Sequence, residues 1–320
     1  SNPSIDDSEY DDLKKKYDHL LLNNPELKKY DDLGIGTSPS SKFKKFSHFE
    51  PMLSLSNSFS LNDTEEFFDK ASNFLKKQNS NYIFNVDCKI DGVSLSVIYK
   101  NNKLFKAITR GDGVVGEEIT ENVLGIRGIP KLLKNCKSDL IEIRGEVFFF
   151  RNDFEELNKQ FEKKNQFSNP RNAASGSLRQ INSKIAKNRP LRFIPHGYGI
   201  FTYEKEFLNF EDFLNFCRKN NFDQTGYSKK YDNLIDIYNY ISDIEKKRSS
   251  INFDIDGMVI KINDLDLQRK LGSTNKFPRW AIAAKFSSEE ALTQVEKIEL
   301  QIGRTGAITP VERLKPINIG

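Results

Sequence analysis

Lys89 stands in a segment whose other residues are typical of a covered β-strand. In VDCKIDGVSLSVIY, residues 86–99, apolar side chains lie on both sides of the lysine, and this density predicts a strand with at least one buried face. A lysine is rarely buried unless another group pairs with it or a reaction uses it. Two interpretations follow: Lys89 contacts solvent from an edge strand, or it is a reactive amine.

A nucleophilic lysine needs a partly apolar site with other cations nearby. The free ammonium group has a pKa of about 10.4, and burial and neighbouring positive charges both lower it. Lys261 ends the apolar run GMVIK, and Lys285 ends WAIAAK. One embedded lysine usually extends its amine to water. Three lysines of this kind favour the reactive-amine interpretation over simple solvent contact.

Two further segments carry candidate nucleotide-binding residues. Glu146 lies within IEIRGEVFFF, where a buried carboxylate is costly unless it is paired or hydrogen-bonded. A ribose hydroxyl or a structural ion pair would satisfy it equally well. NPRNAASGSLRQ carries Arg171 and Arg179 among small residues, and arginine suits bidentate contact with phosphate.

The glycine-rich segment TRGDGVVGEEIT, residues 109–120, includes Arg110. Its spacing matches neither a P-loop nor a dinucleotide-binding fingerprint. An ordinary hairpin loop therefore remains an alternative for this segment.

The elements that must position these side chains follow from periodicity and turn signals. Strands are predicted at 82–88, 93–99, 104–110, 140–150, 192–201 and 257–262, and helices at 8–23, 64–78, 117–124, 152–164 and 231–248. The connection KNNK, residues 100–103, favours antiparallel pairing of its two strands. The pattern predicts an α+β fold with a small helical part before about residue 60.

Length, net charge and cysteine content limit the classes of protein to which the chain can belong. The chain has 320 residues, a net charge of +4 and three widely spaced cysteines, Cys88, Cys136 and Cys217. The mild positive charge permits a polyanionic partner, and the cysteine pattern favours a reducing compartment over a disulfide framework or a zinc site. No apolar run of about 18 residues predicts a membrane span, and the acidic N-terminus is no signal peptide.

Several motifs, in this order, give the chain a resemblance to a known family. They are DDSEYDDL, PMLSLSN, CKIDGVSLS, TRGDGVVGEEIT, RGEVFF, NPRNAASGSLRQ, FDIDGMVIKIN, RWAIAAKF and GRTGAITPVERLKP. Together they resemble the bacterial NAD-dependent DNA ligases over nearly the whole chain. The short K-x-D-G motif alone is shared with ATP-dependent ligases and capping enzymes. NPRNAASGSLRQ and GRTGAITP are more specific.

The resemblance implies the domain organisation. A nucleotidyltransferase (ATP-grasp-like ligase) domain of antiparallel sheets with flanking helices is expected at 58–312. A small helical domain that binds the nicotinamide nucleotide, truncated at its start, is expected at 1–57. Residues 313–320 would lead toward an oligonucleotide-binding barrel that is absent. The expected protein is a cytoplasmic, monomeric adenylation fragment of an enzyme that seals nicked double-stranded DNA in replication and repair.

The resemblance also implies the chemistry and the site residues. Lys89 would attack NAD+, release nicotinamide mononucleotide and retain AMP for transfer to the 5′-phosphate of a nick. The residues expected to bind NAD+ are Asp7, Tyr10, Asp11, Ser54, Leu55, Asp87, Arg110, Glu146, His196, Lys261 and Lys285, with Glu146 on the ribose and His196 on the adenine. Those expected around the nick, AMP or metal are Arg171, Arg179, Arg248 and Asp256.

Mg²⁺, with Mn²⁺ as an alternative, is the expected metal. Mg²⁺ usually keeps several waters and shares phosphates, so no metal-ligand cluster of protein residues is expected.

The chain departs from the family pattern at three places. Asp87 stands where the family usually has glutamate, so its carboxylate is one methylene shorter. Ser94 stands where ATP-dependent ligases carry arginine, which favours the NAD branch. The chain begins after the position of a Tyr-His pair that grips the nicotinamide ring. Self-adenylation without nick sealing, and slower than in a longer protein, is therefore expected.

Other interpretations remain beside this one. The chain could be an ATP-dependent ligase, a capping enzyme, or a basic nucleic-acid-binding module without chemistry. His19 and His48 are expected to be structural or solvated, Cys88 a small buried hydrophobe and Trp280 part of the core. The lysine-rich runs 14–16 and 42–45 are expected to be solvated faces, with contact to a DNA backbone as the alternative.

Overall fold

The computed structural model describes residues 43–76, 82–203, 206–287, 292–302 and 308–316. These residues fall into two compact units, with the boundary between Phe286 and Ser287. The first unit carries both large sheets, and the second carries one hairpin. The predicted helix at 8–23 lies outside the described residues, as does most of the predicted domain at 1–57.

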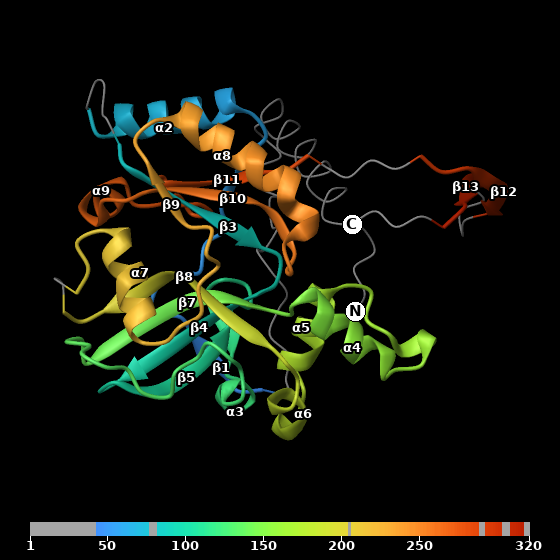
Figure 1. Cartoon of the computed structure of the whole chain (residues 1–320), viewed down its shortest axis with the longest axis horizontal. Helices are drawn as coiled ribbons and strands as arrows, with labels where there is room; N and C mark the ends of the chain where they lie inside the picture. The colour runs from blue at the N-terminus through green and yellow to red at the C-terminus, as the bar shows by residue number, and fades with distance from the viewer. Residues whose placement is uncertain (1–42, 77–81, 204–205, 288–291, 303–307, 317–320) are drawn as a thin grey trace. The chain divides into compact units, whose positions relative to one another are not determined.

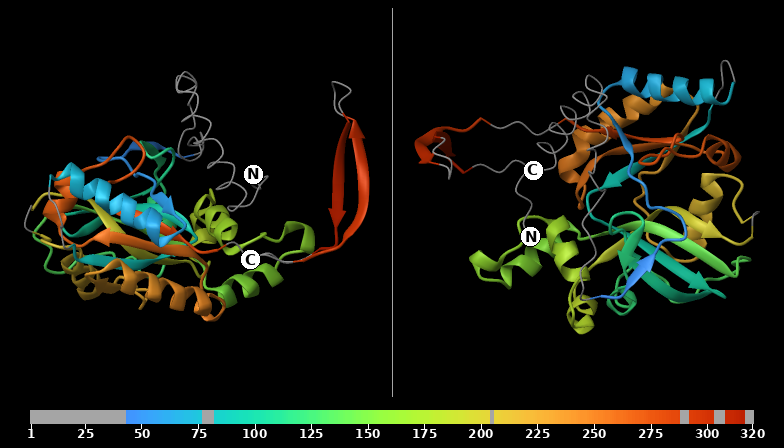
Figure 2. Two further views of the ribbon diagram at one scale, coloured as in Figure 1. Left: turned by 90° about the horizontal axis from the view of Figure 1, so that it is seen from above. Right: turned by 180° about the vertical axis from the view of Figure 1, so that it is seen from behind.

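The first unit is built on two large sheets that lie one above the other in Figure 1 and, seen from behind, in Figure 2. The five-stranded sheet has the order β2 (Ser56–Ser58), β11 (Ala281–Lys285), β10 (Ile255–Ile262), β3 (Phe84–Ile90) and β9 (Lys229–Tyr231). Only β2 and β11 pair in parallel there. The four-stranded sheet is antiparallel, with the order β5 (Lys103–Thr109), β4 (Val93–Lys100), β7 (Leu140–Phe148) and β8 (Arg192–Phe201).

Two smaller pairs of strands complete the sheets. In the first unit, β1 (Lys45–Ser47) pairs antiparallel with β6 (Val115–Glu117). In the second unit, β12 (Val295–Ile302) pairs antiparallel with β13 (Ile308–Leu314).

Helices α2 (Leu61–Phe74) and α8 (Leu234–Lys247) pack together against the five-stranded sheet (Figure 1). In α8, Ile237, Ile241 and Ile244 are buried at the spacing of one helical face. Asn233 caps the helix by accepting a hydrogen bond from the backbone N–H of Asp236, which satisfies one of the free amides of the first turn. The predicted helix at 231–248 is therefore confirmed for most of its length, but it begins at Leu234 because Tyr231 ends strand β9.

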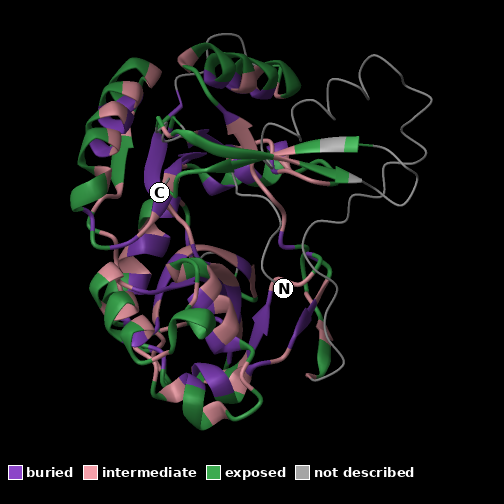
Figure 3. Cartoon of the chain, turned by 90° about the vertical axis from the view of Figure 1, so that its right-hand side faces the viewer, coloured by how far each residue is buried: buried purple, intermediate pink, exposed green. Residues whose placement is uncertain are grey.

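One hydrophobic core lies against the four-stranded sheet and another against the five-stranded sheet. The core of the four-stranded sheet includes buried residues from several helices. The helices of this part are α3 (Thr120–Val123), α4 (Arg151–Lys159), α5 (Pro170–Leu178), α6 (Ser183–Lys187) and α7 (Phe210–Lys219), and α9 (Leu265–Leu271) follows β10. Figure 3 shows burial concentrated in the strands, with exposed residues along the outer faces of the helices. None of the helices that the structure describes is both long and apolar enough to cross a membrane.

The turn between β4 and β5 explains why these strands pair as predicted. Asn101 and Asn102 both have positive φ angles, 48° and 65°. A two-residue hairpin turn of this kind requires positive φ at both central residues, and asparagine tolerates it better than most residues. The antiparallel register between β4 and β5 follows from this turn.

The α+β class is confirmed, but several predicted elements are wrong or were missed. The predicted helix at 117–124 is reduced to α3, because Val115–Glu117 forms a strand paired with β1. No prediction covered α7, although Asn209 and Asp212 form a capping box at its start. The short helices α5 and α6 were also missed.

Candidate active site

Lys89 lies on β3, which pairs with β10 along its length and with β9 only at Phe84–Val86, and its amine is held by a carboxylate. Strand β3 lies between β10 and β9, and the Lys89 side chain is only 27% exposed. Its Nζ donates to Asp256 Oδ2 at 2.7 Å, and Lys285 Nζ donates to the same oxygen at 2.9 Å. The sheet register produces this arrangement, because Gly257 of β10 pairs with Lys89 on one side and with Lys285 on the other.

The two ammonium groups determine the charge of Asp256. Burial opposes ionisation of this carboxyl, but Lys89 and Lys285 outweigh burial and hold its pKa below the ordinary value. Asp256 is therefore a carboxylate at neutral pH, shared by two cations. Its other oxygen, Oδ1, is buried and has no hydrogen-bond partner among the described residues.

Lys261 lies on the same sheet and is more deeply buried. Its Nζ donates to Asp87 Oδ2 at 3.2 Å and to the backbone oxygen of His196 at 2.6 Å, which links β10 to β8 of the other sheet. Burial lowers the pKa of Lys261, and the Asp87 carboxylate opposes this shift. We call Lys89, Lys261 and Lys285 with Asp87 and Asp256 the lysine cluster.

Glu146 faces this region from β7 of the four-stranded sheet. Ser94 Oγ donates to Glu146 Oε2 at 2.9 Å, and His196 Nε2 lies 3.7 Å from that oxygen. Burial raises the pKa of Glu146 to about 7, although Ser94 and the charges of Arg171 and Lys89 oppose the rise. The carboxyl is therefore protonated more readily than an exposed glutamate.

His196 does not supply a charge partner for Glu146 at neutral pH. Surrounding protein atoms, Lys261 and Arg144 lower the pKa of its imidazole. The side chain is still 43% exposed, so solvent limits the effect of burial. A lowered pKa leaves the ring neutral, and the 3.7 Å contact is then no ion pair.

The predicted residues Ser54 and Leu55 approach the site from a segment before β2. Ser54 Oγ accepts a hydrogen bond from Arg110 Nη2 at 2.7 Å. The backbone N–H of Ser54 donates to the backbone oxygen of Lys276 at 3.1 Å. Leu55 is half-buried and directly precedes β2, which pairs with the strand that carries Lys285.

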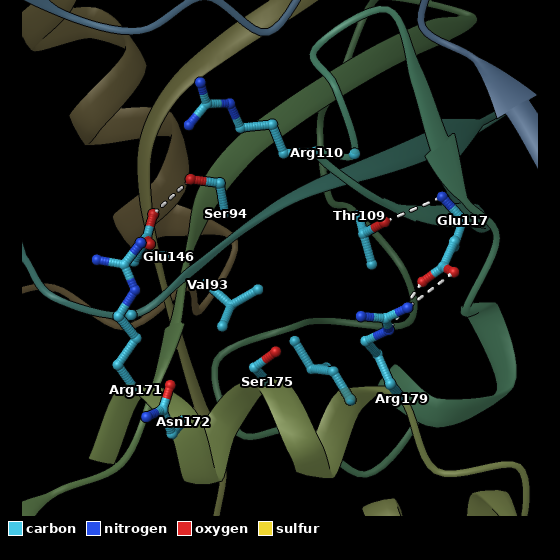
Figure 4. Close-up of a pocket in the computed structure, with 13 residues that line it drawn as sticks. Val93, Ser94, Thr109, Arg110, Glu117, Glu146, Arg171, Asn172, Ser175 and Arg179 are labelled. Atoms are coloured by element: carbon cyan, nitrogen blue, oxygen red, sulfur yellow. Dashed lines mark hydrogen bonds and ion pairs between the residues drawn. The ribbon is translucent and has the colours of Figure 1, made fainter. Parts of the chain in front are cut away.

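A cavity of about 280 Å³ lies between the ends of β4 and β5 and helix α5 (Figure 4). Arg110, directly after β5, and Glu146 of β7 line one side of it, and Arg171 and Arg179 line it from α5 and its end. The remaining lining residues are Gly92, Val93, Ser94, Thr109, Gly111, Glu117, Asn172, Ser175 and Leu178.

Two of the three arginines that line the cavity, Arg171 and Arg179, each pair with a carboxylate. Arg171 Nη1 lies 2.8 Å from Asp91 Oδ1, and Arg179 Nε lies 3.2 Å from Glu117 Oε2. The arginine side chains are 47% and 40% exposed. We call these two contacts the arginine pairs.

Four of the predicted site residues lie away from this arrangement or outside the described residues. Arg248 begins the short 3₁₀ helix Arg248–Ser250, and its guanidinium lies 5.9 Å from the ring centroid of Phe286. It does not line the cavity. The three predicted nicotinamide-binding residues, Asp7, Tyr10 and Asp11, lie outside the described residues.

Sequence reasoning missed the partners Asp91 and Glu117. A signal existed for each, since Asp91 follows Lys89 by two residues and Glu117 lies in the glycine-rich segment. The predicted core position of Cys88 is confirmed, because this thiol is buried and burial raises its pKa to about 12. Trp280 packs against the core of the five-stranded sheet, as predicted.

The site is therefore built from two sheets, with lysines in the strands of one and a carboxyl and an arginine-lined cavity on the other. The family profile described as NAD-dependent DNA ligase adenylation domain matches residues 40–289. The chain belongs to this family.

Relatives agree with the profile. A DNA ligase of Bartonella tribocorum is 42% identical over 327 residues, covering 99% of this chain and 45% of that protein. DNA ligases of Ehrlichia ruminantium and Pelagibacter ubique are each 43% identical, covering 100% of this chain and 46% and 47% of theirs. The chain thus spans less than half the length of these relatives.

A solved ATP-dependent DNA ligase from bacteriophage T7, in complex with ATP, is 13% identical with a TM-score of 0.35, covering 80% of this chain and 79% of that one. A TM-score this low supports no conclusion about this chain.

Proposed function

We propose that this chain is the adenylating part of a DNA ligase and that Lys89 is its nucleophile. The Lys89 ammonium would first lose a proton, and its amine would then attack the α-phosphorus of NAD+. A nitrogen–phosphorus bond forms, the phosphorus–oxygen bond to nicotinamide mononucleotide breaks, and a second proton leaves the nitrogen. Membership of the family supports the reaction. The observation that carries the assignment is the Asp256 carboxylate, which holds Lys89 and Lys285 on a single oxygen.

The charges of the lysine cluster suit this reaction. Phosphoryl transfer gathers negative charge on the oxygens around phosphorus, and cations fixed beforehand stabilise that charge. Three amines face two carboxylates in the cluster, which leaves one positive charge in excess. Lys285 and Lys261 would stabilise the phosphate, while Asp256 orients the amine of Lys89.

The neighbouring groups suit the AMP part of NAD+. A carboxyl with a pKa of about 7 can accept or donate a hydrogen bond, so Glu146 would bind a ribose hydroxyl. The neutral ring of His196 would stack on adenine. Arg110, Ser54 and Leu55 would close the site from one side. Asp87, which already pairs with Lys261, would act on adenine only through that contact.

The arginine pairs suit the second substrate, nicked double-stranded DNA. Arginines that are nearly half exposed can exchange a carboxylate for a phosphate, so Arg171 and Arg179 would contact the nick. Arg248 would contribute from outside the cavity. The enzyme would act in the cytoplasm in replication and repair. The division into 1–57, 58–312 and 313–320, and the roles of Asp7, Tyr10 and Asp11, remain predictions.

Mg²⁺, or Mn²⁺ in its place, would be held mainly by phosphates and water. Among the described residues no group of three or more acidic, histidine or cysteine side chains could bind a metal. Asp256 Oδ1, buried without a hydrogen-bond partner, is the protein oxygen that fits such an ion. A bound divalent cation would neutralise charge on the phosphates.

The test is intact-mass analysis after separate incubations with NAD+ and ATP, followed by peptide mapping. The proposal expects one adenylyl group from NAD+, located on Lys89, and none from ATP. An adduct that forms equally from ATP, or that maps to another residue, would contradict it.

A further inference from the structure

A buried ion pair in the four-stranded sheet holds the segment that carries Ser54. Glu142 of β7 is 1% exposed, and its carboxylate accepts hydrogen bonds from Ser96 Oγ at 2.7 Å and from Arg144 Nε at 2.9 Å. Arg144 Nη2 also donates to Glu142 Oε2 at 3.1 Å. Burying these charges is costly, and an apolar pair would fill the same place in a sheet.

Arg144 also binds backbone oxygens of a distant segment, so this ion pair does more than fill space in the sheet. Arg144 Nη2 donates to the backbone oxygen of Glu50 at 2.7 Å, and Nη1 donates to that of Pro51 at 3.1 Å. These acceptors lie 94 and 93 residues away in the chain. The planar fork of arginine serves the carboxylate and both carbonyl oxygens together, which a lysine ammonium cannot do.

The segment 48–54 is tied at further points around Arg144. The backbone N–H groups of His48 and Met52 donate to the backbone oxygens of Val114 and Gly113. His48 Nε2 lies 3.1 Å from the backbone oxygen of Thr109 and 3.2 Å from that of Arg110. Pro51 has no N–H of its own, so the stretch between His48 and Met52 depends on its carbonyl contacts.

We propose that Arg144, oriented by Glu142, is a positioning residue for the nucleotide site. It fixes the backbone of residues 48–54 and thereby holds Ser54, whose hydroxyl accepts the hydrogen bond from Arg110 at 2.7 Å. Arg110 lines the cavity beside Glu146. The inference rests on the proposed function, because it takes Ser54 and Arg110 as groups that bind NAD+.

The decisive variant is Arg144→Lys, which keeps a positive charge beside the buried Glu142 but loses the fork. The readout is the single-turnover rate of adduct formation on Lys89 as a function of NAD+ concentration. The half-saturating concentration is expected to rise about tenfold or more, the size of one lost hydrogen bond to a charged group. The maximal rate is expected to stay within about threefold, because the lysine cluster is untouched.

Arg192→Lys is the matched control. Arg192 is also an ion-paired arginine of the four-stranded sheet, with Nη1 3.2 Å from Asp223 Oδ2 and a side chain 22% exposed. It does not contact residues 48–54 in any hydrogen bond of the structure. This variant is expected to behave as the unchanged protein. If Arg144→Lys and Arg192→Lys gave the same half-saturating concentration, the inference would be wrong.

Two further measurements separate positioning from direct binding or general weakening. In a protein that already carries Ser54→Ala, Arg144→Lys should add less than about threefold to the loss, because both changes act on one contact. If the loss in the double variant equalled the product of the losses in the two single variants, the inference would be wrong. Exchange of the hydrogen-bonded amides of Met52 and Ser54 should become faster in Arg144→Lys and stay unchanged in Arg192→Lys.

The exchange measurement needs no reaction. If exchange were unchanged in Arg144→Lys, Arg144 would not hold residues 48–54 in place, and the inference would be wrong whatever the activity of the variant. By contrast, the absence of any adduct on Lys89 in the unchanged protein would count against the proposed function alone.

Discussion

The lysine cluster and the arginine pairs hold their charges in different ways. In the lysine cluster, three amines share two carboxylates, and the side chains are between 7% and 27% exposed. In the arginine pairs, each cation has its own carboxylate, and the arginines are 47% and 40% exposed. The lysines come from strands of the five-stranded sheet, whereas the arginines come from α5 and its end.

This difference suits the lysine cluster to catalysis and the arginine pairs to reversible binding. Strand-held amines with one positive charge in excess cannot move far, so they suit a reaction in which charge develops at a fixed place. The arginines are nearly half exposed, so they can reach a partner in solvent, whereas their carboxylates Glu117 and Asp91 are only 4% and 24% exposed. The arginines suit a partner that binds and leaves. The predictions below test this division from the largest expected effect to the smallest.

Asp256→Asn should have the largest effect, because it leaves Lys89 and Lys285 as neighbouring cations without their carboxylate. Breaking a buried ion pair costs roughly 3–5 kcal/mol of unfolding free energy, and loss of an orienting charge should slow adduct formation about 100-fold or more. Denaturant unfolding and single-turnover adenylation measure the two effects. Adduct formation at the unchanged rate would mean that Asp256 does not orient the nucleophile.

Glu146 lies between the two regions and should make stability depend on pH. Its pKa in the folded protein is about 7, raised by burial from an ordinary 4.5. A raised carboxyl pKa means that the folded state binds the proton more tightly, so stability falls as pH rises from about 4.5 to about 7. In Glu146→Gln, the decrease in unfolding free energy over this pH range should be smaller by up to roughly 3 kcal/mol.

Denaturant unfolding at pH 5 and pH 8 measures the difference, with Glu155→Gln as the control. Glu155 is an exposed residue of α4. Equal pH dependence in the unchanged protein and in Glu146→Gln would show that Glu146 titrates as an ordinary surface carboxyl.

Arg179→Met should have the smallest effect on the first chemical step. Its guanidinium is 40% exposed, but its partner Glu117 is only 4% exposed, so the variant should lower stability by leaving this buried carboxylate without the arginine. The rate of adduct formation on Lys89 should stay within about threefold, because the lysine cluster is unchanged. A 100-fold loss in that rate would show that Arg179 takes part in the first chemical step, which contradicts the proposed division of roles.

The sequence predicted the parts of the site that depend on local pattern. Apolar alternation and the turn at 100–103 predicted strands β3, β4 and β5, and the three strand-embedded lysines stood out as unusual residues. The structure brings Lys285 to the same carboxylate as Lys89. Residue types in a strand pattern were sufficient for this expectation.

Contacts between distant segments could not be predicted from the pattern. Asp256 lies 167 residues from Lys89, and Arg144 lies more than 90 residues from the carbonyl oxygens that it binds. Such contacts depend on the order and register of strands, which local periodicity does not determine. The same limit explains why Arg248 was grouped with the cavity arginines although it lies beside Phe286.

The most direct test of the account compares two lysine variants after incubation with NAD+. Lys89→Ala removes the proposed nucleophile, and Lys106→Ala removes a similarly paired lysine of β5, whose Nζ lies 2.6 Å from Glu118 and whose side chain is 22% exposed. Intact-mass analysis should show one adenylyl group on the unchanged protein and on Lys106→Ala, and none on a folded Lys89→Ala. An adenylyl group on Lys89→Ala would contradict the account.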